Sequence, residues 1–156
     1  SLDLMRSDCS SHFIRMMDDM DIQHDWRQFE STETVATEYN AGLGMVVDGF
    51  MAAGVRLCLD DFGSGYANLN TVMRLPFSAI KIDRTLLFDI CNDKKRAMFY
   101  QSIIETFHRM GYSIVSEGVE TEEEMSLLSS WGVDMIQGYY FSRPLPVEEL
   151  LKLLSM

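Results

Sequence analysis

The chain has 156 residues, 47% of them hydrophobic and 24% charged, a composition typical of one folded globular domain. Its formal net charge of −11 argues against binding to DNA or RNA polymers, since such proteins place Lys and Arg against phosphate. No hydrophobic run approaches the ~18 residues of a membrane helix, and we expect no signal peptide at the start of the chain. The three cysteines are odd in number and lack the spacing of a metal site, so we expect reduced thiols. We therefore expect a cytoplasmic domain. A membrane anchor elsewhere in the parent protein is compatible with this expectation.

The first part of the chain predicts a strand, a helix, a second strand and a second helix. Leu2–Leu4 is the first strand candidate, and hydrophobic residues at helical spacing predict a helix from about Ser11. Trp26–Glu30 is the next strand candidate. Ala41–Ala53 is the next helix, which Gly54 closes at the position where helices commonly stop.

The middle of the chain contains its most hydrophobic strand. Val55–Leu59 ends in the adjacent acids Asp60 and Asp61, which we expect to point in different directions because side chains alternate along a strand. A glycine-rich loop follows, then a short helix at about Tyr66–Met73. Ala79–Ile82 is the next strand.

The last third of the chain contains a clear helix start. Thr121 with Glu124 three residues later forms a capping box, which predicts a helix as far as Trp131. The other predicted elements are a long amphipathic helix at Asp93–Met110, strands at Tyr112–Val115 and Met135–Gln137, and a last helix from Pro146.

Strands that alternate with helices across short loops predict parallel βα units, so the fold class is α/β. Both an open doubly wound sheet and a barrel fit this pattern. Polar residues at the ends of several strands favour the barrel, because an open sheet usually binds its ligand at one or two crevices. The six strand candidates are fewer than the eight of a closed barrel, so we expect one domain over 1–156 that is incomplete at its N-terminal side, with two βα units missing.

Five motifs stand in one order along the chain and resemble the EAL family of cyclic-di-GMP phosphodiesterases. The resemblance covers nearly the whole chain, and it implies a TIM-like barrel that hydrolyses cyclic di-GMP to linear pGpG with two Mg²⁺ or Mn²⁺ ions in bacterial signalling. The motifs are Glu30–Glu33 (E-S-T-E), Asp60–Gly65 (D-D-F-G-S-G), Lys81–Asp83 (K-I-D), Glu117–Thr121 (E-G-V-E-T), and Gln137–Tyr139 followed by Arg143–Pro146.

The chain also departs from the family. The Glu-Ala-Leu segment, whose glutamate is a metal ligand in the family, is not found, and Asp3 stands where the family has Asn. Because a ligand and two barrel units are lost, we expect this chain alone to have little or no hydrolytic activity. The alternative function is a degenerate domain that acts as a cyclic-di-GMP receptor or as a protein-interaction module.

Hydrolysis of a phosphodiester needs an activated water and neutralised phosphate charge, and paired divalent ions supply both. Oxygen ligands select Mg²⁺ or Mn²⁺, and the chain offers carboxylates rather than a His/Cys cluster. For acids at strand ends, the simpler interpretations are a solvated side chain or a helix cap. With the resemblance included, we predict these metal ligands: Asp3, Glu30, Asp60, Asp61, Asp83 and Glu117.

Three residues are predicted to act in catalysis. Lys81 lies in an otherwise hydrophobic strand, and a buried lysine is costly unless it is paired, so we expect it to contact the acids. The resemblance places Lys81 near the metals or the attacking water, makes Glu117 a general base or metal-site residue, and places Gln137 on the water or substrate. For Arg143 two interpretations stay open, a contact with phosphate or guanine and a plain surface arginine, and the surface arginine is preferred. His12, His24 and His108 are interpreted as surface or packing residues.

The loop after the central strand is predicted to support the site. By resemblance Glu33 holds this loop, which comprises Phe62, Gly63, Ser64 and Gly65, and the glycines allow backbone angles that other residues disfavour. Glu120 is interpreted as structural. In the family, the loop and the helix after it couple dimerisation to metal binding, so we expect a homodimer through Tyr66–Met73. The parent protein is expected to carry GGDEF or sensory domains.

Overall fold

The computed structural model describes residues 9–32, 41–65 and 69–155. The predicted strand at Leu2–Leu4, the predicted metal ligand Asp3 and the predicted loop support Glu33 lie outside these residues. The same holds for the first part of the predicted helix at Tyr66–Met73. None of the described helices is both long and hydrophobic enough to cross a membrane.

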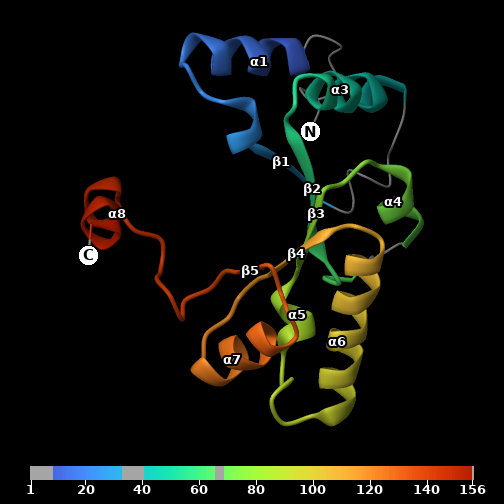
Figure 1. The fold of residues 1–156 in the computed structure, drawn as a ribbon, viewed down its shortest axis with the longest axis vertical. Helices are drawn as coiled ribbons and strands as arrows, with labels where there is room; N and C mark the ends of the chain where they lie inside the picture. The colour runs from blue at the N-terminus through green and yellow to red at the C-terminus, as the bar shows by residue number, and fades with distance from the viewer. Residues whose placement is uncertain (1–8, 33–40, 66–68, 156) are drawn as a thin grey trace.

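The described strands form one parallel sheet with helices between them, which confirms the predicted α/β class (Figure 1). Five strands lie in the sheet in chain order: β1 (Gln28–Thr32), β2 (Arg56–Phe62), β3 (Ala79–Ile82), β4 (Ser113–Ser116) and β5 (Met135–Ile136). The helices are α1 (Cys9–Asp19), the 3₁₀ turn η2 (His24–Trp26), α3 (Ala41–Ala52), α4 (Leu69–Arg74), α5 (Arg84–Leu87), α6 (Lys94–Arg109), α7 (Glu122–Ser130) and α8 (Val147–Leu154).

Most element boundaries agree with the sequence, and the differences have local causes. Asp93 caps α6 and Thr121 forms the predicted capping box of α7. The β2 strand runs three residues further than predicted, through Asp60, Asp61 and Phe62, because the ladder with β3 continues there. Helix α5 was missed, since four residues are too few to show a helical period.

One face of the sheet carries the main hydrophobic core. Leu59, Ile80 and Ile114 are 0% exposed and pack with Ile104 and Phe107 of α6, which runs alongside the sheet (Figure 1). These side chains alternate with residues on the other face, as the period of two along a strand requires. The helix-covered face is therefore apolar, and polar side chains are left to the opposite face.

A smaller core joins α1 to α3 near β1. Val46 and Phe50 of α3 are buried there, and Ile14 and Met17 of α1 pack against them. The other hydrophobic residues predicted on the same face of α1 are more exposed: Phe13 is 41% exposed, Met16 40% and Met20 63%. Helix α1 thus buries only part of its apolar face among the described residues.

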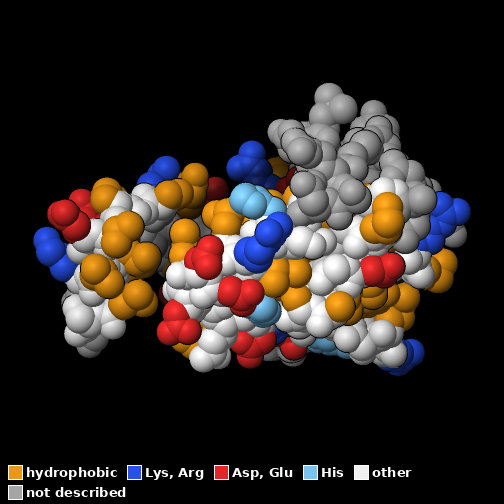
Figure 2. Space-filling view, turned by 90° about the horizontal axis from the view of Figure 1, so that it is seen from above, with side chains coloured by type: hydrophobic (Ala, Val, Ile, Leu, Met, Phe, Trp, Pro, Cys, Tyr) orange, Lys and Arg blue, Asp and Glu red, His pale blue; other side chains and the backbone are white. Residues whose placement is uncertain are grey.

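The two outer strands are open on one side. Within the described sheet, β1 pairs only with β2 and β5 pairs only with β4. Helix α8 stands apart from the sheet at the end of an extended stretch (Figure 1), and hydrophobic side chains gather on this protruding part (Figure 2). Val147, Leu151 and Leu154 of α8 are 71%, 62% and 74% exposed. Because β1 and β5 each have one unpaired edge, the described strands form an arc rather than a closed barrel.

Candidate functional site

The face of the sheet opposite the main core carries a charged cluster centred on Lys81. This side chain lies in β3, between β2 and β4, and the residue is only 8% exposed. Its Nζ lies 2.8 Å from Oδ1 of Asp60, 2.8 Å from Oε1 of Glu117 and 3.2 Å from Oε1 of Glu30. The sequence argument that a buried lysine must be paired with acids is confirmed.

A β-bulge brings Asp60 and Asp61 to the same side of the sheet. Leu59 pairs with Ile80 and Phe62 pairs with Ile82, so the two acids together oppose Lys81. Asp61 takes a left-handed backbone conformation with φ of 59°, as the extra residue of a bulge often does. The expectation that the two acids point in different directions is therefore wrong, because the bulge interrupts the alternation of side chains.

The bulge gathers three carboxylates into one group. One oxygen each from Asp60, Asp61 and Glu117 lie within 4.8 Å of one another. Glu30 is not in this group; its carboxylate contacts Lys81 from the edge strand β1. Asp83 is not in it either: Oδ1 of Asp83 accepts the backbone N–H of Thr85 at 2.9 Å and so caps α5.

The electrostatics of the cluster favour a bound cation. Burial raises the pKa of Glu117, although the hydrogen bond from Lys81 acts against this increase. The pKa of Asp61 is also raised, by burial first and then by the charges of Asp60 and Asp83. Burial alone lowers the pKa of Lys81, but its bonds to the carboxylates outweigh burial and raise it, so the ammonium stays charged.

The three gathered carboxylates fit Mg²⁺ or Mn²⁺. They offer only hard oxygen donors, which these ions prefer, and they lie close enough together to share an ion. Among the described residues, these three acids are the one group of three or more acids, histidines or cysteines whose ligand atoms all lie within 4.8 Å of one another. The nearby thiol of Cys58 is buried, which with the surrounding charges raises its pKa to about 12, so it stays protonated and is a poor ligand.

Helix α5 anchors the loop after β2, a role that the sequence did not indicate. The backbone N–H of Asp83 donates to the carbonyl of Phe62 at 3.0 Å, and Oγ1 of Thr85 donates to the carbonyl of Gly63 at 3.2 Å. Gly63 has φ of +96°, and a Cβ there would overlap the side chain of Leu86. Helix α5 therefore holds the loop through contacts between residues that are distant in the sequence, and a local sequence pattern does not reveal such contacts.

The loops after β4 and β5 meet so closely that Gly138 admits no side chain. A Cβ on Gly138 would overlap the backbone of Val119, whose N–H donates to the carbonyl of Gln137 at 3.2 Å. This contact places Gln137 beside Glu117, and both line a cavity of about 240 Å³. The predicted residues Asp83 and Glu120 and the exposed ring of Tyr139 line the same cavity.

Arg143 and the three histidines have surface or packing positions. Arg143 is exposed, and its guanidinium stacks 4.4 Å from the ring centre of Tyr139. His24 contacts the carbonyl of Ala53 and the carboxylate of Asp18, each at 2.9 Å. His12 is exposed, and His108 binds Asp134 at 2.8 Å. The three histidines are surface or packing residues, as predicted.

Comparison with known proteins identifies the fold. The family model described as "EAL domain" matches residues 1–144. The chain is 32% identical over 137 residues to the cyclic di-GMP phosphodiesterase PA2567 of Pseudomonas aeruginosa. The aligned region covers 88% of this chain and 23% of that protein. It thus spans less than a quarter of the length of that relative.

Solved structures give the same result. The EAL enzyme Bd1971 in its cAMP- and cyclic-di-GMP-bound form superposes with a TM-score of 0.91 at 28% identity, over 99% of this chain and 41% of that chain. The manganese and cyclic-di-GMP complex of Klebsiella pneumoniae BlrP1 superposes with a TM-score of 0.83 at 30% identity, over 91% of this chain and 36% of that chain. The arc of parallel strands is thus part of a TIM-like barrel, and the chain belongs to the EAL domain family.

Proposed function

We propose that the chain is part of a cyclic-di-GMP phosphodiesterase that cleaves its substrate to linear pGpG at the carboxylate cluster. The observation that carries the proposal is the group of Asp60, Asp61 and Glu117, whose oxygens lie within 4.8 Å of one another beside the ammonium of Lys81. Relatives named as phosphodiesterases and a manganese complex with cyclic di-GMP support it. The ions proposed here are Mg²⁺ or Mn²⁺, two per complete domain.

The residues of the cluster have distinct roles in this proposal. Bound divalent ions supply charge neutralisation at the phosphate and acidify water. Glu117 has two alternative roles, as a ligand of the ion or as the base that accepts a proton from the attacking water, and its raised pKa brings it closer to the pH at which a base works best. Lys81 keeps Glu117 and Asp60 in place. Gln137, at the cavity that Glu117 also lines, orients water or substrate through its amide.

The other predicted ligands lie at the margins of the cluster. Glu30 belongs to the edge strand β1, and its side chain is 46% exposed. Asp83 caps α5 through one carboxylate oxygen and lines the cavity that Glu117 also lines. Asp3 lies outside the described residues. Because the described sheet leaves β1 and β5 unpaired on one side, we propose that this chain alone hydrolyses cyclic di-GMP weakly or not at all.

A calorimetric titration with cyclic di-GMP, with and without Mn²⁺, tests the function. Metal-dependent binding together with slow release of pGpG supports the phosphodiesterase. Binding that needs no metal and gives no product favours the receptor, and no binding in either condition favours a protein-interaction module. Glu117→Gln is the matched variant, since it keeps the shape of the side chain and removes the base; it should abolish any pGpG release.

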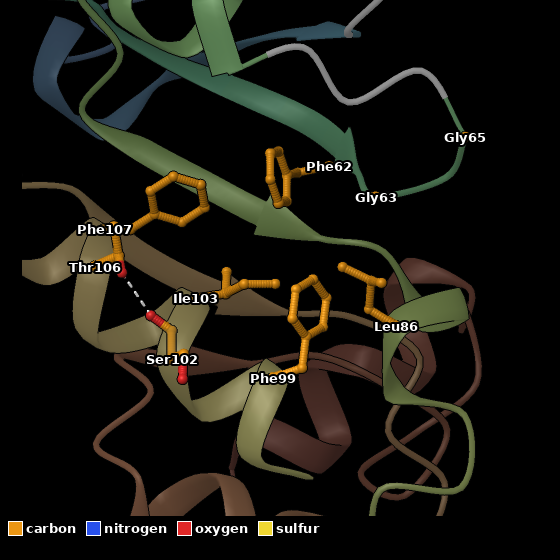
Figure 3. A pocket seen from close by; sticks show the side chains of 9 residues that line it. All are labelled: Phe62, Gly63, Gly65, Leu86, Phe99, Ser102, Ile103, Thr106 and Phe107. Carbon is orange, nitrogen blue, oxygen red and sulfur yellow. Dashed lines mark hydrogen bonds between the residues drawn. The ribbon is translucent and has the colours of Figure 1, made fainter. Parts of the chain in front are cut away.

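We also propose a homodimer through the surface beside the glycine-rich loop. A cavity of about 560 Å³ opens there, lined by Phe62, Phe99 and Phe107 together with Gly63 of the loop (Figure 3). Phe99 of α6 is 57% exposed. Met98, next to it on α6, is 66% exposed, and we propose that a second copy of the chain covers these two side chains. The remaining length of the relatives leaves room for the GGDEF or sensory domains expected in the cytoplasmic parent protein.

Light scattering tests the dimer. Phe99→Asp should convert a dimer to a monomer, whereas Phe88→Asp, at a phenylalanine that is 68% exposed and does not line this cavity, should leave the mass unchanged. A monomer at all concentrations of the unmodified chain would contradict the proposal.

A further inference from the structure

We infer that Lys81 is a resident cation of the site: without metal, its ammonium holds the surrounding carboxylates together, and a divalent ion takes over part of that role when it binds. The inference rests on the proposed ion site but not on hydrolysis of cyclic di-GMP. It concerns what keeps four acids in one place in the metal-free protein.

The first argument is geometric. Lys81 lies in β3, and its three carboxylate partners come from different strands: Glu30 from β1, Asp60 from β2 and Glu117 from the residue after β4. One ammonium therefore ties together four neighbouring strands at the same edge of the sheet. Its contacts are 2.8 Å, 2.8 Å and 3.2 Å, and its side chain is 10% exposed.

The second argument is electrostatic. The partially buried carboxylates of Asp60 and Glu117, only 20% and 16% exposed, would repel one another without a cation between them. Asp61 adds a further negative charge to the same group. Leaving such acids without their partner is strongly destabilising, because buried charge is then uncompensated. Among the residues that the structure describes, the cation in ion-pair contact with Asp60 and Glu117 is Lys81.

The third argument is that Lys81 and a divalent ion share ligands. Oδ1 of Asp60 and Oε1 of Glu117 contact the ammonium, and the same two carboxylates belong to the group that fits an ion. Each carboxylate has two oxygens, so one oxygen can face Lys81 while the other binds the ion. The two cations therefore neutralise the same charge, and the stabilisation that they provide overlaps.

Thermal unfolding of Lys81→Met in EDTA and in Mn²⁺ tests this role. In EDTA we expect the variant to melt about 6 °C or more below the unmodified chain, as for a broken buried ion pair in a chain of this size. Mn²⁺ should raise the melting temperature of Lys81→Met by more than it raises that of the unmodified chain, because the ion then replaces the missing charge. Lys152→Met, at an exposed lysine of α8, is the control and should behave like the unmodified chain.

A second variant keeps the test decisive if Lys81→Met does not fold in EDTA. Adding Glu30→Gln removes one of the acids left without a partner, so the double variant should recover part of the lost stability. Folding of Lys81→Met only with Mn²⁺, or recovery in the double variant, supports the inference. No recovery in the double variant and no rescue by Mn²⁺ overturn it.

The outcomes also separate this inference from the proposed function. Equal melting temperatures of Lys81→Met and the unmodified chain in EDTA overturn the inference, while a stabilising effect of Mn²⁺ in that experiment leaves the ion site standing. If Mn²⁺ stabilises neither protein, the ion site is overturned. A loss of stability in EDTA that Glu30→Gln partly recovers would then still support Lys81 as the cation that holds the acids.

Discussion

The middle of the sheet and its two edges differ in how firmly they hold the site. All four residues of β3 are buried between two neighbouring strands, whereas β1 and β5 have no buried residue, only half-buried and exposed ones. Asp60 and Glu117 belong to the well-packed middle, and Glu30 and Gln137 belong to the edges. Side chains on well-packed strands are held more firmly than those on strands with one unpaired edge, so we expect Asp60 and Glu117 to be better positioned than Glu30 and Gln137.

The largest expected effect tests the packing difference directly. Ile80→Ala in β3 removes a side chain that is 0% exposed, so we expect a loss of about 2–5 kcal/mol in the free energy of unfolding. Met135→Ala in β5, at a side chain that is 50% exposed, should change it by no more than about 0.5 kcal/mol. Urea unfolding measures both; similar losses would mean that the edge strand is as well packed as the middle.

A smaller effect is expected for ion binding. Asp60→Asn alters a member of the carboxylate group and should weaken Mn²⁺ binding by about 10- to 100-fold. Glu30→Gln should weaken it less, because Glu30 contacts Lys81 but lies outside that group. Calorimetry with Mn²⁺ gives both affinities. A larger loss for Glu30→Gln than for Asp60→Asn would reverse the ranking of middle and edge.

The smallest effects concern the pH dependence of stability, which should have opposite directions at Asp134, near β4, and at His24, near α1 and α3. Burial of Asp134 acts to raise its pKa, but bonds from the N–H of Ile114 and from His108 outweigh it and lower the pKa below the ordinary value of 3.8. A lowered pKa means that the carboxylate stabilises the fold above pH 3.8 and that this stabilisation is lost as the pH falls through the lower folded-state value. Asp134→Asn should therefore remove part of the acid-induced loss of stability in a pH series of melting temperatures.

His24, on the α1 and α3 side, should show the opposite dependence. The carbonyl of Ala53 and the carboxylate of Asp18 raise its pKa above 6.5. The protonated ring then stabilises the fold below pH 6.5, and this contribution is lost as the pH rises through the folded-state value. We expect His24→Gln to flatten the melting temperature between neutral and mildly alkaline pH. An unchanged profile would show that the contact is too exposed to matter.

Much of the fold follows from local patterns in the sequence. The buried runs of β2 and β3, the Asp93 cap of α6 and the capping box of α7 at Thr121 were predicted because each depends on residues within one turn or one strand. Helix α5 was not predicted because four residues are too few to show a helical period. The contact from Thr85 to Gly63 was not predicted because it spans 22 residues of chain.

The sequence by itself indicated a set of acids at strand ends and the family that the chain resembles, because strand ends and short motifs are local features. It did not show which of those acids come together as a group, and that group is Asp60, Asp61 and Glu117. Only the tertiary structure decided that Asp60 and Asp61 face the same way and that Lys81 bonds three carboxylates at once. The physical reason is register: the direction of a strand side chain depends on its pairing with the neighbouring strand, and a single bulged residue reverses it.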